Sequence, residues 1–101
     1  MTGHIQNIDT DGYFNLAFEY YQKLIHNNLE LNEELPNNIV MSDLYINNKS
    51  ISVMDKNKAA PRSGVEVSLE LFINKHTNPI GHYILFVDYN NKFIDEFLVF
   101  T

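Results

Sequence analysis

The four histidines, His4, His26, His76 and His82, are the side chains of this sequence best suited to binding a metal ion. None of them occurs at the HxH, HxxxH or HExxH spacing that places two imidazole rings on one metal. His76 and His82 flank a single expected turn and would have to meet across it to share an ion. The sequence also contains no glycine-rich phosphate loop. We therefore expect neither a metal nor another cofactor.

Three carboxylates, Asp88, Asp95 and Glu96, lie near the last expected hairpin. Two carboxylates held close together can act as a general acid and a general base when their surroundings separate their pKa values. Successive residues of a strand point to opposite faces, so Asp95 and Glu96 should not meet, and Asp88 need not lie beside Asp95. No serine has a GxSxG context. We predict no catalytic residue and no enzyme, although a carboxylate pointing inward into a cavity would argue for one.

Glu66, Ser68 and Glu70 should project together from one face of a strand, because they alternate with apolar residues. Acidic side chains beside aromatic ones suit an interface with a basic protein, since aromatic residues supply much interface energy and opposite charges speed encounter. Which apolar residues lie beside them depends on the strand register. One register brings Ile84 and Phe86 to this face. The other brings Tyr83, Leu85, Val87 and Tyr89.

We predict Glu66, Glu70, Asp95 and Glu96 as the residues that bind a partner. The alternative is that the apolar neighbours are core residues and the glutamates only keep the protein in solution. The net charge of −6 favours a basic partner and disfavours binding to a phosphate backbone. Four of the seven basic residues lie between positions 49 and 62, which is where nucleic acid would bind if it bound at all.

A chain of 101 residues predicts one domain spanning residues 1–101. The sequence has no apolar run long enough to span a membrane, and its first residues lack the features of a signal peptide. It contains no cysteine, which is compatible with a reducing cytoplasm. We therefore expect a cytoplasmic protein that binds neither membrane nor nucleic acid.

A helix is predicted from Gly12 to about Asn28, with Thr10 or Asp11 as its cap. Its apolar residues recur at helical spacing over a wide arc, which suits a helix lying deep against a sheet. Phe18 and Tyr21 are on this arc and should both be buried.

Five strands are predicted after the helix. Ile39–Ile46 and Ser50–Met54 would form a hairpin around Asn47–Lys49, and the last three strands would be Val65–Ile73, His82–Tyr89 and Phe93–Phe100. A tight turn is expected at Tyr89–Lys92, because asparagine tolerates a positive φ. The last two strands are apolar on both faces, and one helix can cover only one of these faces. The rest of the chain, a second copy or a partner must cover the other.

The predicted fold class is therefore α+β, with one N-terminal helix on an antiparallel sheet of about five strands. This order of elements resembles the cystatin-like and NTF2-like domains. The small, acidic, cysteine-free character also resembles bacterial immunity proteins, which implies a non-enzymatic inhibitor that neutralises a basic toxin nuclease. The alternatives are an NTF2-like domain that binds or converts a small ligand, and a structural subunit that forms a homodimer.

Overall fold

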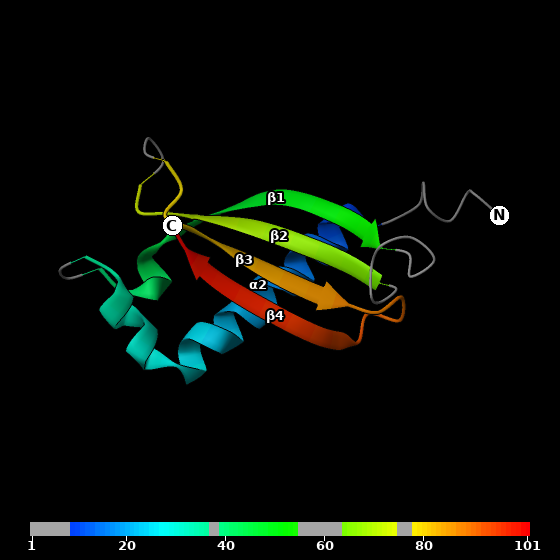
Figure 1. The fold of residues 1–101 in the computed structure, drawn as a ribbon, viewed down its shortest axis with the longest axis horizontal. Helices are drawn as coiled ribbons and strands as arrows, with labels where there is room; N and C mark the ends of the chain where they lie inside the picture. Colours follow the sequence, from blue (N-terminus) through cyan, green and yellow to red (C-terminus); the bar gives the residue numbers. More distant parts are fainter. Residues whose placement is uncertain (1–8, 37–38, 55–63, 75–77) are drawn as a thin grey trace.

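The computed structural model describes residues 9–36, 39–54, 64–74 and 78–101, and within these ranges the chain is one helix packed on one antiparallel sheet. In Figure 1 the long helix crosses the far side of the sheet. The predicted α+β architecture is thus confirmed. In chain order the elements are α2 (Thr10–Asn27), the short 3-10 helices η1 (Leu29–Glu34) and η2 (Met41–Asp43), and the strands β1 (Tyr45–Met54), β2 (Gly64–Phe72), β3 (Gly81–Val87) and β4 (Phe93–Phe100).

Among the described residues the sheet is a meander of four strands in the order β1-β2-β3-β4, with every pair antiparallel. The prediction of five strands is wrong because the expected first hairpin is a single strand. Asn47–Lys49, taken as a turn, lies inside β1, where the register with β2 shifts between Asn48 and Ser50. A bulge accommodates one extra residue without ending the strand, so the polar run at this point bends β1 instead of reversing it.

Helix α2 begins two residues earlier than predicted because Asp9 caps it. Oδ1 of Asp9 accepts a hydrogen bond of 2.9 Å from the backbone N–H of Gly12. This side chain satisfies an N–H of the first turn that has no partner within the helix. Neither Thr10 nor Asp11 is the cap, although Asp11 adds a favourable negative charge to the first turn. None of the helices among the described residues combines the length and apolar character needed to cross a membrane.

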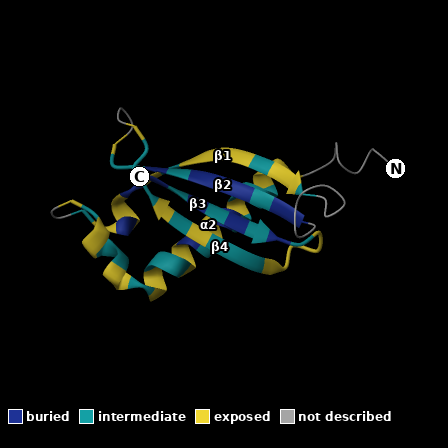
Figure 2. Cartoon of the chain, viewed as in Figure 1, coloured by how far each residue is buried: buried dark blue, intermediate teal, exposed yellow. Residues whose placement is uncertain are grey.

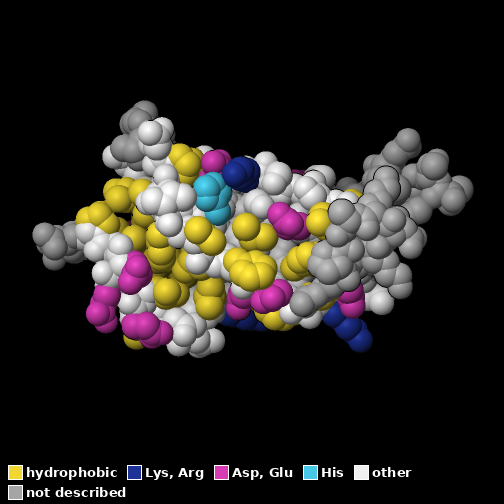
Figure 3. All heavy atoms as spheres, in the orientation of Figure 1, with side chains coloured by type: hydrophobic (Ala, Val, Ile, Leu, Met, Phe, Trp, Pro, Cys, Tyr) yellow, Lys and Arg dark blue, Asp and Glu magenta, His cyan; other side chains and the backbone are white. Residues whose placement is uncertain are grey.

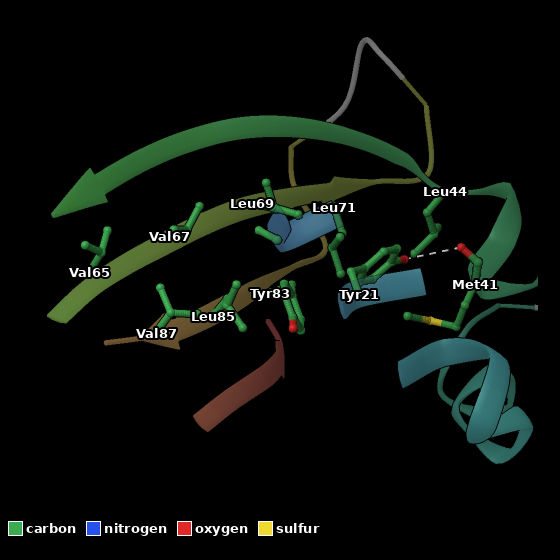
Figure 4. Close-up of a cluster of buried hydrophobic side chains, with 11 residues drawn as sticks. Tyr21, Met41, Leu44, Val65, Val67, Leu69, Leu71, Tyr83, Leu85 and Val87 are labelled. Carbon is green, nitrogen blue, oxygen red and sulfur yellow. Dashed lines mark hydrogen bonds between the residues drawn. The ribbon is translucent and has the colours of Figure 1, made fainter. Parts of the chain in front are cut away.

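The core lies between α2 and the sheet, and Figure 4 shows side chains of β2 and β3 gathered beside Tyr21 of α2. Tyr21 is the largest buried side chain that α2 contributes to this core. Its ring lies edge-on to that of Tyr83, with 5.6 Å between the ring centres, and its hydroxyl donates to the carbonyl of Met41 at 3.3 Å. Phe18, by contrast, is 39% exposed and lies on the flank of the helix, so its predicted burial is wrong. The strand side of this core comprises Val65, Val67, Leu69, Leu71, Tyr83, Leu85 and Val87.

The hairpin between β3 and β4 confirms the predicted turn. The backbone N–H of Asn91 donates to the carbonyl of Asp88 at 2.9 Å, and Asn91 has a φ of 64°. The register then shifts, because Phe86 pairs with Asp95 while Val87 pairs with Phe93. This bulge places Phe93 on the helix side of β4, where its ring lies 5.3 Å from that of Tyr20. Simple alternation along β4 would put Phe93 and Asp95 on the same face, and the bulge places them on opposite faces.

Candidate protein-binding surface

The two faces of the sheet are covered differently. One face packs against α2, and we call the other the open face. Figure 2 shows that β2 is largely buried, whereas β1 and β4 are half-buried or exposed over much of their length. On β2, β3 and β4 the open face comprises Glu66, Ser68, Glu70, Phe72, His82, Ile84, Phe86, Asp95, Phe97 and Val99.

Strand pairing arranges the open face in rows that run across β2, β3 and β4. Glu66 pairs with Phe86, and Phe86 pairs with Asp95. Side chains directly opposite each other on antiparallel strands lie about 5 Å apart. The Phe86 side chain is therefore flanked by a carboxylate on either side, one from β2 and one from β4. The next two rows are Ser68, Ile84 and Phe97, and then Glu70, His82 and Val99.

This register decides between the two sets of apolar neighbours left open by the sequence. Ile84 and Phe86 share the face of Glu66 and Glu70. Tyr83, Leu85 and Val87 are instead fully buried on the helix side. Phe97 and Val99, on β4, complete the apolar part of the open face, and they are 49% and 47% exposed. Figure 3 shows hydrophobic side chains gathered at the surface over β3 and β4, with acidic side chains beside them.

Three of the four predicted partner-binding residues share the open face, and the fourth does not. Glu66, Glu70 and Asp95 all point away from the helix. Glu96 lies on the helix side, where its Oε1 accepts a hydrogen bond of 2.6 Å from the hydroxyl of Tyr83. Burial, helped by this hydrogen bond, raises the pKa of Tyr83 well above its ordinary value. The structure therefore assigns Glu96 to the support of a buried tyrosine and separates it from the other three carboxylates.

The three carboxylates considered for acid–base work are also separated. Oδ1 of Asp88 accepts the N–H groups of Asn90 and Lys92 at 2.8 and 2.9 Å, so Asp88 holds the hairpin turn. Asp95 is on the open face and Glu96 is on the helix side. Glu96 does point inward, and an inward carboxylate that entered a cavity would argue for an enzyme. Its partner Tyr83, however, is completely buried, and the space under α2 is filled by core side chains.

The candidate metal ligands are not brought together in the described structure. His82 is on the open face, paired with Glu70 on one side and Val99 on the other. His76 lies outside the described residues, as do His4 and most of the basic cluster between positions 49 and 62. Among the residues that the structure describes, no group of three His, Asp or Glu side chains is placed to hold a metal ion.

Phe97 and Val99 are the surface residues that sequence reasoning did not single out. The signal for them exists in the alternation of β4, but the bulge beside Phe86 shifts that alternation relative to Phe93. Only strand pairing shows which apolar residues of β4 accompany Glu66 and Glu70. No protein-family model, curated protein or solved structure matches the chain.

Proposed function

We propose that this chain is a non-enzymatic binding protein that docks a basic protein on the open face of its sheet. The observation that carries the proposal is the mixed row in which Glu66, Phe86 and Asp95 stand side by side. Half-exposed Phe97 adds apolar area in the neighbouring row, and Glu70 adds a third carboxylate. Apolar anchors beside acidic groups give a cationic partner both contact energy and electrostatic attraction.

The charge of the open face favours a basic partner over a second copy placed against the same face. A symmetric face-to-face dimer would bring Glu66, Glu70 and Asp95 of both copies into one interface. Unpaired carboxylates buried against each other cost several kcal/mol per ion. The net charge of −6 also attracts a cationic partner over longer distances.

In its most specific form, the proposal is that the chain is a cytoplasmic inhibitor that neutralises a toxin nuclease, as immunity proteins do. A nuclease that cleaves RNA carries a basic active-site surface, because it must bind a phosphate backbone. An acidic protein face of matching size would occupy that surface and exclude the RNA. Inhibition requires no chemistry from the chain itself, which agrees with the separation of Asp88, Asp95 and Glu96.

The test compares two triple variants with the same change in charge. Glu66→Gln, Glu70→Gln and Asp95→Asn together remove the three carboxylates of the open face. Glu30→Gln, Glu33→Gln and Glu34→Gln remove three exposed carboxylates of η1. Each set changes the net charge from −6 to −3, which is −6 plus three neutralised carboxylates. Both variants and the parent are titrated against a panel of purified basic ribonuclease toxin domains, with binding rates and RNA cleavage as readouts.

We expect the parent to bind and inhibit at least one of these nucleases. The open-face variant should lose at least about tenfold in affinity, which corresponds to about 1.4 kcal/mol, and the η1 variant should remain close to the parent. Equal weakening by both variants would show that total charge, and not the open face, attracts the partner. Failure of the parent to inhibit any nuclease, while it still binds basic proteins through the open face, would reject the nuclease and retain the docking surface.

A further inference from the structure

The two edges of the sheet differ in their protection against pairing with another strand. β1, at one edge, carries the exposed Lys49 at its bulge, and half of its residues are both exposed and polar. A bulge and an edge lysine are both features that hinder edge-to-edge pairing. β4, at the other edge, has its bulge only near the hairpin, beside Phe93, contains neither lysine nor proline, and carries its only charged residues, Asp95 and Glu96, in its first half. Its last four residues, Phe97–Phe100, are all apolar.

The backbone of β4 has groups that point away from the sheet and are not paired with another strand in the described structure. The N–H of Thr101 donates to the carbonyl of Ile80 at 2.9 Å, which fixes the alternation of hydrogen bonds between β3 and β4. Under that alternation the peptide groups of Phe97 face β3, and those of Glu96 and Leu98 face outward. The N–H of Glu96 donates to Oδ1 of the adjacent Asp95 at 2.9 Å. A side chain therefore accepts the hydrogen bond that the carbonyl of a neighbouring strand would otherwise accept.

From this edge we infer that two copies of the chain associate by antiparallel pairing of β4 with β4, which joins the two sheets into one. This inference concerns the edge of the sheet and does not depend on the basic partner proposed for the open face. The two-fold axis would pass between the Phe97 residues of the two copies, which would lie directly opposite each other. Asp95 would then lie opposite Val99 of the second copy, and Glu96 would lie opposite Leu98.

The charges of β4 and the length of the ladder together favour this register. With Phe97 at the axis, no carboxylate lies directly opposite another carboxylate. Moving the axis by one residue to Glu96 would place two Glu96 side chains opposite each other, and like charges in that position are destabilising. Moving it to Leu98 would avoid that contact but would shorten the ladder. A change of one residue in the pairing register itself is not available, because it would place the helix side of one copy beside the open face of the other.

Helix α2 supports the same arrangement, because it reaches beyond the edge that would be paired. In Figure 1 the C-terminal half of α2 emerges past the free edge of β4. Tyr20 lies on this side of the helix, against Phe93, which is 43% exposed. Leu24, one turn further on, is likewise only half-buried. A strand added to β4 would therefore lie beneath an apolar flank of α2 instead of having water on both faces.

The register can be tested by cross-linking, since the sequence contains no cysteine. In Phe97→Cys the two new thiols would lie directly opposite each other at the axis, within the Cα separation of about 4.4 to 6.8 Å that a disulfide requires. In Val99→Cys, the matched control on the same strand and face, the thiol would lie opposite Asp95. Under mild oxidation we expect a covalent dimer from the first variant and a monomer from the second. Phe97 and Val99 are half exposed, so both variants should fold, and circular dichroism checks this.

A pair of lysine variants provides a second test on the purified chain without any partner. Light scattering at increasing concentration should show the parent as a dimer at about 100 μM. Phe97→Lys places two positive charges at the axis and should raise the dissociation constant at least about tenfold, whereas Val99→Lys faces Asp95 and should retain the dimer. A monomeric parent at this concentration would overturn the inference. Equal cross-linking of both cysteine variants, or equal loss of the dimer in both lysine variants, would also overturn it.

Discussion

The hydroxyl of Tyr83 donates a hydrogen bond of 2.6 Å to Oε1 of Glu96 on the helix side of the sheet. Tyr83 is fully buried, so its hydroxyl depends on this acceptor. Glu96→Leu should therefore lower the free energy of unfolding by about 1–3 kcal/mol, because it leaves a buried donor unsatisfied. Glu96→Gln keeps an acceptor and should cost less. Urea unfolding of both variants measures the difference, and equal losses would show that the hydrogen bond contributes nothing measurable.

Glu96 should also be silent in partner binding. Its place beside Tyr83 removes it from the open face, although the sequence places it next to Asp95. Glu96→Gln should bind any partner of the open face with the rate constants of the parent. Asp95→Asn should slow association, most strongly at low salt, because attraction between exposed charges is screened as salt rises. Stopped-flow association at low and high salt distinguishes the two variants. A greater effect of Glu96 would place the interface elsewhere.

Stability should fall in alkaline solution because buried tyrosines must lose a proton. Burial raises the pKa of Tyr21 from 10.0 to about 12 in the folded chain. The folded state then binds this proton more tightly than the unfolded state, so the stabilisation is complete below pH 10 and is lost as the pH rises toward 12. Each such tyrosine contributes a slope of about 1.4 kcal/mol per pH unit within its window.

Tyr21→Phe isolates this contribution. The variant lacks the hydrogen bond to the Met41 carbonyl, so its stability at neutral pH should be lower by about 1 kcal/mol. Its decline above pH 10 should be shallower than that of the parent, with Tyr83 still contributing. Thermal unfolding between neutral pH and pH 12 records the two slopes. Identical slopes would mean that the Tyr21 hydroxyl titrates equally in the folded and unfolded chain.

The two aromatic residues on α2 should differ in their importance for stability. Tyr21→Ala removes a ring that is 2% exposed and should cost about 3–5 kcal/mol. Phe18→Ala removes a ring that is 39% exposed and already partly in water, so its cost should be no more than about half as large. Denaturant unfolding of the pair provides the comparison. A larger loss from Phe18→Ala would mean that the helix is rotated about its axis.

The turn between β3 and β4 should tolerate glycine better than alanine. Asn91 has a φ of 64°, a conformation that costs most residues about 1–2 kcal/mol. Asn91→Ala should be destabilising by about 1 kcal/mol, and Asn91→Gly should be close to neutral. Lys92→Ala, in the same turn, is a control without this requirement, because Lys92 is not a positive-φ residue. If alanine and glycine had equal effects, the backbone at position 91 would not be held in this region.

The sequence predicted the elements whose local pattern is self-consistent. Phe93–Phe100 is a strand at the predicted bounds, and the turn before it carries the expected asparagine with positive φ. The helix was found because its apolar stripe has a clear period. Its cap was misplaced since Asp9, Thr10 and Asp11 are all competent, and only the geometry of the first turn chooses among them.

What the sequence could not predict was set by pairing between strands. The polar run Asn47–Lys49 suits a turn and a bulge equally well, and the choice depends on how β1 lies against β2. The same limit applies to the open face. Alternation separated Asp95 from Glu96, but it could not show that Asp95 joins Glu66 while Glu96 meets Tyr83, because both facts depend on the register of β3.

The order of the strands has a consequence for how the chain is made. Each strand pairs with its immediate neighbour in the sequence, so the sheet can grow by one hairpin at a time. Helix α2, however, packs mainly on β2 and β3, which the ribosome synthesises well after it. The apolar stripe around Ala17 and Tyr21 is therefore exposed to water until β2 and β3 emerge from the ribosome. During that interval this exposed apolar surface is open to aggregation and to binding by chaperones.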